Sequence, residues 1–275
     1  MAADVFISVI FIVAMIVLHI LRMRELTEKI DLQDDVLIGA ASILGTRQVQ
    51  QDYFGVKKTK DAALVLLADG TGENGEYAAK MSVDTFRDLF DNESAIVQPQ
   101  YFFKRAANAT NKRIVNTLEE RQGTSSVVAA IFYKSQLFYT LVGNCKIAIF
   151  REGDLIPVSE GQTIDVLARH AYTEGKISKQ ETLALLNEHR RYNVLGQDSF
   201  QDIEIFDTPL SLYRDDIVVM MSEGVFNALR WVDLEAALSK EDSVQNLAKN
   251  IIKMVERSPK VDKENATVLL ISRKK

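Results

Sequence analysis

Four acidic residues lie at the ends of apolar segments that are far apart in the chain: Asp52, Asp69, Glu223 and Glu264. Asp69 ends the apolar run ALVLLA and is followed by Gly70. Each acid alone could cap a helix or close a turn. Together they favour a divalent cation, because hard cations require several oxygen ligands and strand ends can gather carboxylates on one edge of a sheet. The pattern predicts a metal site.

The turn that begins at Asp69, with the sequence DGTGENGE, is unsuited to holding a phosphate directly. Glycine-rich turns between a strand and a helix often hold phosphates on bare N–H groups, but Asp69, Glu73 and Glu76 would repel one. The spacing excludes a calcium loop of the EF-hand type, because its glycine would fall on Asn74 and its closing glutamate on Lys80. An ordinary Asp-Gly turn remains the alternative.

Composition and charge indicate a folded, acidic chain. Its 275 residues are 47% hydrophobic and 26% charged, with 13 Gly and 4 Pro, which suits one large globular domain. The net charge of -5 argues against a partner nucleic acid bound through phosphate neutralisation. The single cysteine, Cys145, cannot form an internal disulfide, so a reducing compartment is expected for the folded part.

Short β-rich runs alternate with longer helical stretches through the rest of the chain. Two segments, 125–143 and 146–159, have the alternation and central turns of β-hairpins. Three others, 76–90, 99–121 and 242–257, have apolar residues at helical spacing. Consecutive hairpins with helices between them predict an α+β fold of antiparallel sheets covered by helices, not a doubly wound parallel sheet.

The N-terminus predicts a transmembrane signal anchor. The segment from Val5 to Leu21 has no formal charge and is just long enough to cross a bilayer. Arg22, Arg24 and Lys29 follow it, which predicts a single-pass membrane protein with the remainder in the cytoplasm. We therefore expect an anchor at 1–23, a juxtamembrane linker at 24–38 and a folded domain at 39–275. The linker is interpreted as a solvated helix, with homodimer formation through it as the alternative.

The order of eight short motifs resembles the metal-dependent protein phosphatase family, protein phosphatase type 2C, over nearly all of residues 40–272. No single motif is specific, but their order over this length makes coincidence improbable. The motifs are RQVQQD (Arg47 to Asp52), DGTGENG, GTSS, VGNCK, GKISKQE, HRRYNVLG, SEG and ENAT.

This resemblance implies two antiparallel sheets packed as a sandwich between helices, with two manganese or magnesium ions at the site. It further implies hydrolysis of phosphoserine or phosphothreonine in a protein substrate by a metal-activated water, without a phosphoenzyme. A polar segment between strands, 173–191, is expected to be a mobile flap. The implied roles are phosphate binding by Arg47, a water held by Asp52, bridging of the ions by Asp69, and further metal ligands from the Gly70 carbonyl, Glu223 and Glu264.

Three positions depart from the family pattern. Glu223 and Glu264 replace aspartates, and Asn144 replaces an aspartate that holds a further, weakly bound metal. Each longer side chain displaces its carboxylate by roughly one methylene, and magnesium requires near-ideal octahedral geometry. Manganese could tolerate the change better. Two hypotheses follow: an active membrane-tethered phosphatase with an altered metal site, or a pseudophosphatase that acts as a regulatory or binding module. A purely structural α+β domain is the third.

Overall fold

A computed structural model describes residues 36–118 and 122–273. The predicted membrane span and most of the predicted linker lie outside these ranges. Within them, no helix combines the length and apolar character needed to cross a bilayer. Residues 36–38, expected to end the linker, instead begin strand β1 (Val36–Ile43). The reason is that Val36 and Ile38 pack against the buried cluster between the two sheets.

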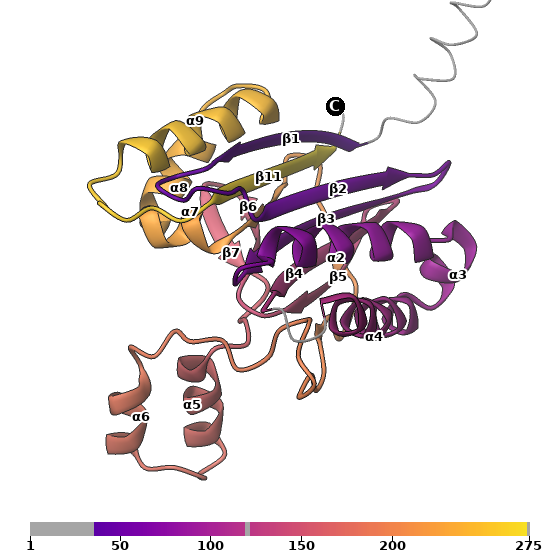
Figure 1. Cartoon of the computed structure of the whole chain (residues 1–275). Helices are drawn as coiled ribbons and strands as arrows, with labels where there is room; N and C mark the ends of the chain where they lie inside the picture. The colour runs from indigo at the N-terminus through magenta and orange to yellow at the C-terminus, as the bar shows by residue number, and fades with distance from the viewer. Residues whose placement is uncertain (1–35, 119–121, 274–275) are drawn as a thin grey trace, which may run out of the picture. The chain divides into compact units, whose positions relative to one another are not determined.

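Two antiparallel sheets carry the fold (Figure 1). The first has the strand order β1-β11-β10-β6-β7, and the second has the order β2-β3-β4-β5-β8, with β9 paired to β5. The other strands of the first sheet are β6 (Lys146–Arg151), β7 (Asp154–Pro157), β10 (Ile217–Met221) and β11 (Ala266–Arg273). Those of the second are β2 (Asp52–Lys58), β3 (Ala62–Thr71), β4 (Thr124–Tyr133), β5 (Gln136–Val142), β8 (Glu204–Ile205) and β9 (Leu210–Ser211). The predicted α+β class is confirmed, and the two expected hairpins are β4–β5 and β6–β7.

Strand β3 is followed by three helices, α2 (Gly75–Leu89), α3 (Asn92–Val97) and α4 (Pro99–Leu118). Of these, α2 and α4 cover the outer face of the second sheet (Figure 1). Strand β3 is buried on both faces, which explains its unbroken apolar sequence. Successive side chains of a strand point to opposite faces. Leu64 and Leu66 therefore pack with the helices, and Val65 and Leu67 pack between the sheets.

Helices α7 (Glu223–Ala228), α8 (Trp231–Leu238) and α9 (Val244–Arg257) cover the outer face of the first sheet (Figure 1). In α9, Leu247, Ile251 and Val255 recur every four residues and form one buried stripe against that sheet. The layers are therefore helix, sheet, sheet and helix, as the resemblance implied.

The layer between the two sheets is apolar and closed to solvent. It contains Val65 and Leu67 of the second sheet and Met220 and Leu269 of the first, all inaccessible to solvent. Cys145, in the turn between β5 and β6, is also completely buried in this layer.

Between β7 and β8 the chain forms a helical pair, α5 (Ile164–Thr173) and α6 (Lys179–Leu185). The two helices pack against each other. Helix α6 begins with a capping box, in which the Ser178 hydroxyl accepts from the Glu181 N–H at 3.2 Å and the Glu181 carboxylate accepts from the Ser178 N–H at 2.7 Å. The expected flap, residues 173–191, includes α6, and its mobility stays a prediction.

Candidate active site

Asp52 and Asp69 lie directly opposite each other where β2 begins and β3 ends. The two residues are only 6% and 9% exposed. Carboxylates are rarely so buried unless donors or a cation compensate their charge. The pairing of the two strands therefore places two buried acids side by side at one edge of the second sheet.

Asp52 also connects the two sheets. Its Oδ2 accepts a hydrogen bond of 2.7 Å from the hydroxyl of Ser222, the residue that follows β10. The same hydroxyl oxygen accepts from the Thr267 N–H at 2.9 Å. Asp52 Oδ1 is buried and has no hydrogen-bond partner in the part of the chain that the structure describes. Burial raises the pKa of Asp52 to about 6 although hydrogen bonds from Ser222 and Thr267 oppose the rise, and the charge of Glu264 adds to it.

Asp69 is the more strongly perturbed of the two acids. Its Oδ2 accepts a hydrogen bond of 3.2 Å from the Glu223 N–H. Burial raises its pKa well above the ordinary value, and the charges of Asp52 and Glu223 raise it further, while the positive charge of Arg191 acts in the opposite direction. A carboxylate in this setting is stabilised by any cation that approaches it.

Gly70 is required by close contact between two turns. A Cβ atom at this position would lie 2.0 Å from the carbonyl oxygen of Gly75, at the start of α2. The Gly70 N–H donates to the Gln51 carbonyl at 3.0 Å, which extends the β2–β3 pairing past Asp69. The turn thus fixes Asp69 and the Gly70 carbonyl relative to Asp52.

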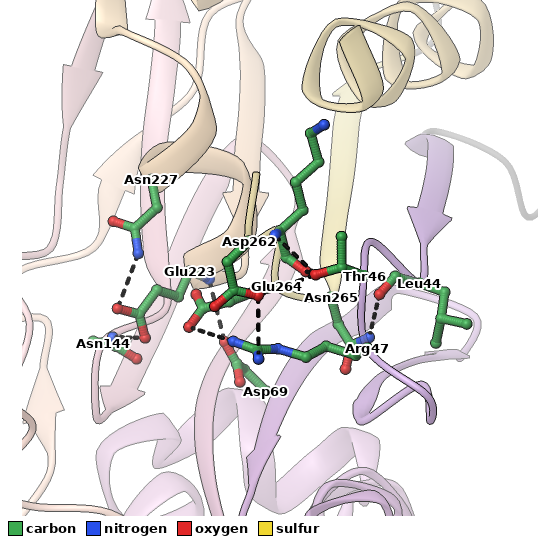
Figure 2. A network of polar contacts seen from close by, with 11 residues as sticks. Leu44, Thr46, Arg47, Asp69, Asn144, Glu223, Asn227, Asp262, Glu264 and Asn265 are labelled. Atoms are coloured by element: carbon green, nitrogen blue, oxygen red, sulfur yellow. Dashed lines mark hydrogen bonds and ion pairs between the residues drawn. The ribbon is translucent and has the colours of Figure 1, made fainter. Parts of the chain in front are cut away.

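Glu223 is turned toward two side-chain amides. Its Oε2 accepts a hydrogen bond of 2.6 Å from Asn144 Nδ2, and its Oε1 accepts one of 3.1 Å from Asn227 Nδ2 (Figure 2). Asn144 Oδ1 in turn accepts from the Ser126 hydroxyl at 3.1 Å. The structure thus places Glu223 beside Asp69 through its backbone, but both of its carboxylate oxygens accept hydrogen bonds from amides.

Arg47 lies with two acids from the loop before β11. Its guanidinium is 3.4 Å from Asp262 Oδ1 and 3.6 Å from Glu264 Oε1 (Figure 2). Asn265 holds the loop that carries Arg47, because it donates to the Leu44 carbonyl at 2.9 Å and accepts from the Gln51 N–H at 2.9 Å. The other oxygen of Glu264, Oε2, is buried without a hydrogen-bond partner among the described residues.

These acids fit a hard divalent cation by charge and by unused oxygens. Within residues 36–118 and 122–273, no group of three or more His, Cys, Asp or Glu side chains is already arranged to hold a metal ion. However, Asp52 Oδ1 and Glu264 Oε2 are buried acceptors with no donor among these residues, and the two charges act on each other. Oxygen atoms of this kind are the ligands that Mg²⁺ and Mn²⁺ prefer. Glu223 could join them only by releasing its two amides.

Three residues at the site were missed by the sequence analysis as functional groups: Ser222, Asn227 and Arg191. Asn227 could have been found, because it lies four residues after Glu223 in α7 and this spacing places two side chains on one helix face. Ser222 precedes Glu223 in the motif SEG and was given no role. Arg191 lies in the motif HRRYNVLG, where its sequence neighbours give no sign that its charge reaches Asp69.

Comparison with known proteins finds the fold but no match by sequence. No protein-family model matches the chain, and no curated protein is similar to it. A serine/threonine phosphatase of S. agalactiae is similar in structure, with a TM-score of 0.75 and 19% identity over 87% of this chain and 100% of that one. Stp1 of Staphylococcus aureus has a TM-score of 0.71 and 16% identity, covering 89% and 97%. The catalytic domain of PstP in complex with two manganese ions has a TM-score of 0.67 and 19% identity, covering 87% and 99%.

The chain therefore has the fold of the PPM-type serine/threonine phosphatases. Structural similarity at 16–19% sequence identity defines the fold alone. The chemistry of the site follows from its own residues.

Proposed function

We propose that this chain is a metal-dependent phosphoserine/phosphothreonine protein phosphatase, tethered to a membrane by its N-terminal segment. The observation that carries the proposal is the buried pair of Asp52 and Asp69 at the edge of a PPM-type sandwich, with an acceptor oxygen left unpartnered. Buried charge without compensation destabilises a fold. The buried acids are explained if a divalent cation compensates their charge during function.

Two divalent ions, manganese or magnesium, would be held by oxygen ligands on both sheets. When bound, such ions lower the pKa of a water molecule and neutralise charge on phosphoryl oxygens. Manganese is favoured, because the longer arms of the two glutamates suit a less demanding geometry. The proposed ligands are Asp52, Asp69, the Gly70 carbonyl, Glu223 and Glu264.

Asp52 is suited to orienting the attacking water. Its Oδ2 is fixed by the Ser222 hydroxyl, and its Oδ1 remains able to accept a hydrogen bond. The hydrogen bond from the Glu223 N–H would hold the Asp69 carboxylate in position.

Arg47 is suited to binding the substrate phosphate. The Arg47 side chain is 44% exposed, and the side chains of Asp262 and Glu264 are 73% and 41% exposed. Exposed ion pairs of this kind contribute only about 0.2–1 kcal/mol, whereas a phosphate dianion can accept two parallel hydrogen bonds from arginine. A phosphate can therefore displace these acids at little cost.

The tether is proposed from the sequence of the first 23 residues. A signal anchor at Val5–Leu21 would keep the phosphatase domain at the cytoplasmic face, where phosphorylated proteins are its substrates. The part of the linker that precedes β1, from residue 24 to 35, could pair two copies. In cell fractionation, the full-length chain should stay in the membrane pellet after a high-salt wash. Release by salt alone would show peripheral attachment instead.

A pseudophosphatase is the second candidate, and the hydrogen bonds of Glu223 favour it. Asn144 and Asn227 together occupy both carboxylate oxygens of Glu223. If these bonds persist when manganese is present, one of the proposed ligands is unavailable and the domain serves for binding alone.

The deciding experiment compares hydrolysis of a phosphothreonine peptide by the full-length chain, purified in detergent with excess manganese, with hydrolysis by Asp69→Asn. The matched control is Asp88→Asn, the same change at an exposed residue of α2. We expect activity in the wild type and in Asp88→Asn, and a loss of both activity and manganese binding in Asp69→Asn. A wild type no faster than Asp69→Asn would exclude the enzyme and leave the pseudophosphatase.

A further inference from the structure

Lys146 is a partly buried cation beside the candidate active site, and among residues 36–118 and 122–273 it has no close anionic partner. It begins β6, two residues after Asn144. Its Nζ lies 5.0 Å from the centre of the Phe226 ring. None of the ion pairs formed by the described residues includes Lys146. Burial lowers the pKa of the ammonium, although more distant carboxylates act in the opposite direction.

The carboxylates whose charges reach Lys146 already have other partners. Asp165 binds Arg169 at 3.1 Å, and Glu223 is held by its two amides. Glu204 accepts hydrogen bonds of 2.9 Å from the N–H groups of Glu160 and Gly161. Apart from its contact with the Phe226 ring, the Lys146 ammonium therefore has donor capacity that none of these carboxylates uses. Removing such a charge from water without a partner is costly, so an anion that reached it would be stabilised.

A pocket of about 270 Å³ lies in front of Lys146. Asn144, Glu223 and Phe226 line it on the side of the candidate active site, and Arg169 and His189 line it from the segment around α5 and α6. Two further acids line it, but Asp165 pairs with Arg169 and Glu160 pairs with His170. Ligand-binding pockets for drug-sized molecules have volumes of about 300–1,000 Å³. This smaller pocket suits a single side chain.

We propose that this pocket binds an acidic side chain of the substrate, and that Lys146 is the residue that determines this specificity. The side chain would be a glutamate, an aspartate or a second phosphorylated residue close to the phosphoserine or phosphothreonine being hydrolysed. The inference rests on the proposed function and adds to it a substrate class, acidic phosphopeptides. Glu223 lines both the pocket and the candidate active site. One bound peptide could therefore place its phosphorylated residue at the active site and a nearby acidic side chain in the pocket.

Binding of two labelled phosphothreonine peptides to the full-length chain tests the proposal. The peptides differ only in having glutamates or glutamines beside the phosphothreonine, and fluorescence anisotropy measures affinity with manganese present. Lys146→Met keeps an unbranched side chain beside Phe226 but removes the ammonium group and its charge. The matched control is Lys134→Met, since Lys134 also lies 5.0 Å over an aromatic ring, that of Tyr133, but in the exposed β4–β5 turn.

We expect the wild type and Lys134→Met to bind the glutamate peptide about tenfold more tightly than the glutamine peptide, as a charge-assisted contact provides. Lys146→Met should bind both peptides equally. Lys146→Gln is a second neutral variant, should Lys146→Met fail to fold, and Lys146→Arg should keep the preference.

Three results would overturn the inference: equal binding of both peptides by the wild type, a preference that survives in the neutral variants, or no binding of either peptide. Hydrolysis of the peptides, measured on the same samples, separates failure of the inference from failure of the proposed function. A preference that depends on Lys146 without any hydrolysis would refute the phosphatase and leave the pocket established.

Discussion

Replacing Asp52 with asparagine should stabilise the metal-free chain. Burial raises the pKa of Asp52 from 3.8 to about 6. At about 1.36 kcal/mol for each pKa unit, keeping the charge buried costs the folded state about 3 kcal/mol. Because this carboxyl binds its proton more tightly when folded, its contribution is fully favourable below pH 3.8. That contribution is lost as the pH rises to about 6. Asparagine has the same shape without the charge.

The assay is urea unfolding of the full-length chain in detergent with EDTA, between pH 4 and pH 7.5. Asp52→Asn should exceed the wild type by on the order of 3 kcal/mol at pH 7.5, and the difference should disappear toward pH 4. Adding manganese should nearly close this gap at one hundred times its dissociation constant, because only the wild type gains from the cation, by about 2.7 kcal/mol. At one thousand times the dissociation constant the gain is about 4.1 kcal/mol, and the order should reverse. Asp88→Asn, at an exposed position, should show no such pH dependence.

Two results would refute this reasoning. An asparagine variant that is no more stable than the wild type in EDTA at pH 7.5 would show that the ionised Asp52 is compensated within the fold. A gain that does not depend on pH would show that the effect comes from packing and not from the charge.

Other residues of the site lead to further predictions. Ser222→Ala should lower the free energy of unfolding by about 2–3 kcal/mol, because the buried Asp52 Oδ2 loses its donor; a loss below 0.5 kcal/mol, measured in urea, would contradict this. Gly70→Ala should cost about 3 kcal/mol or more, because its Cβ would lie 2.0 Å from the Gly75 carbonyl oxygen; an unchanged melting temperature would show that the turn can move. Asn144→Asp replaces a donor 2.6 Å from Glu223 with a like charge. It should lower the melting temperature in EDTA and strengthen manganese binding by calorimetry, and unchanged binding would show that Glu223 takes no part in the site.

Elements with strong local patterns were predicted well from the sequence. The alternation within 125–143 and 146–159 predicted hairpins, and the structure places β4–β5 and β6–β7 there. The buried stripe of α9 was visible as apolar residues at helical spacing. Local periodicity reports the face that a segment buries. It could not show where the linker ends, because the packing of the partly buried Val36 and Ile38 depends on a sheet assembled from distant strands.

The sequence indicated the acidic residues of the candidate site but not their hydrogen-bond partners. The acids were recognisable because each lies next to an apolar run, Asp52 and Glu264 before one and Asp69 and Glu223 after one. The register of β2 with β3 brings Asp52 and Asp69 together. The hydrogen bond between Asn144 and Glu223 joins residues 79 positions apart. No local pattern encodes such a contact. Asn144 was expected to be a poor metal ligand, whereas the structure shows it as a donor that holds a proposed ligand.

The position of Cys145 gives the chain a built-in reporter of its own unfolding. It is the single cysteine, and burial between the sheets raises the pKa of its thiol well above the ordinary value. Since the thiolate is the form that reacts with alkylating reagents, the folded protein should resist labelling. Modification then requires the sandwich to open, so its rate measures how often the two sheets separate. Slower alkylation with added manganese would show, without any substrate, that a cation holds the sheets together.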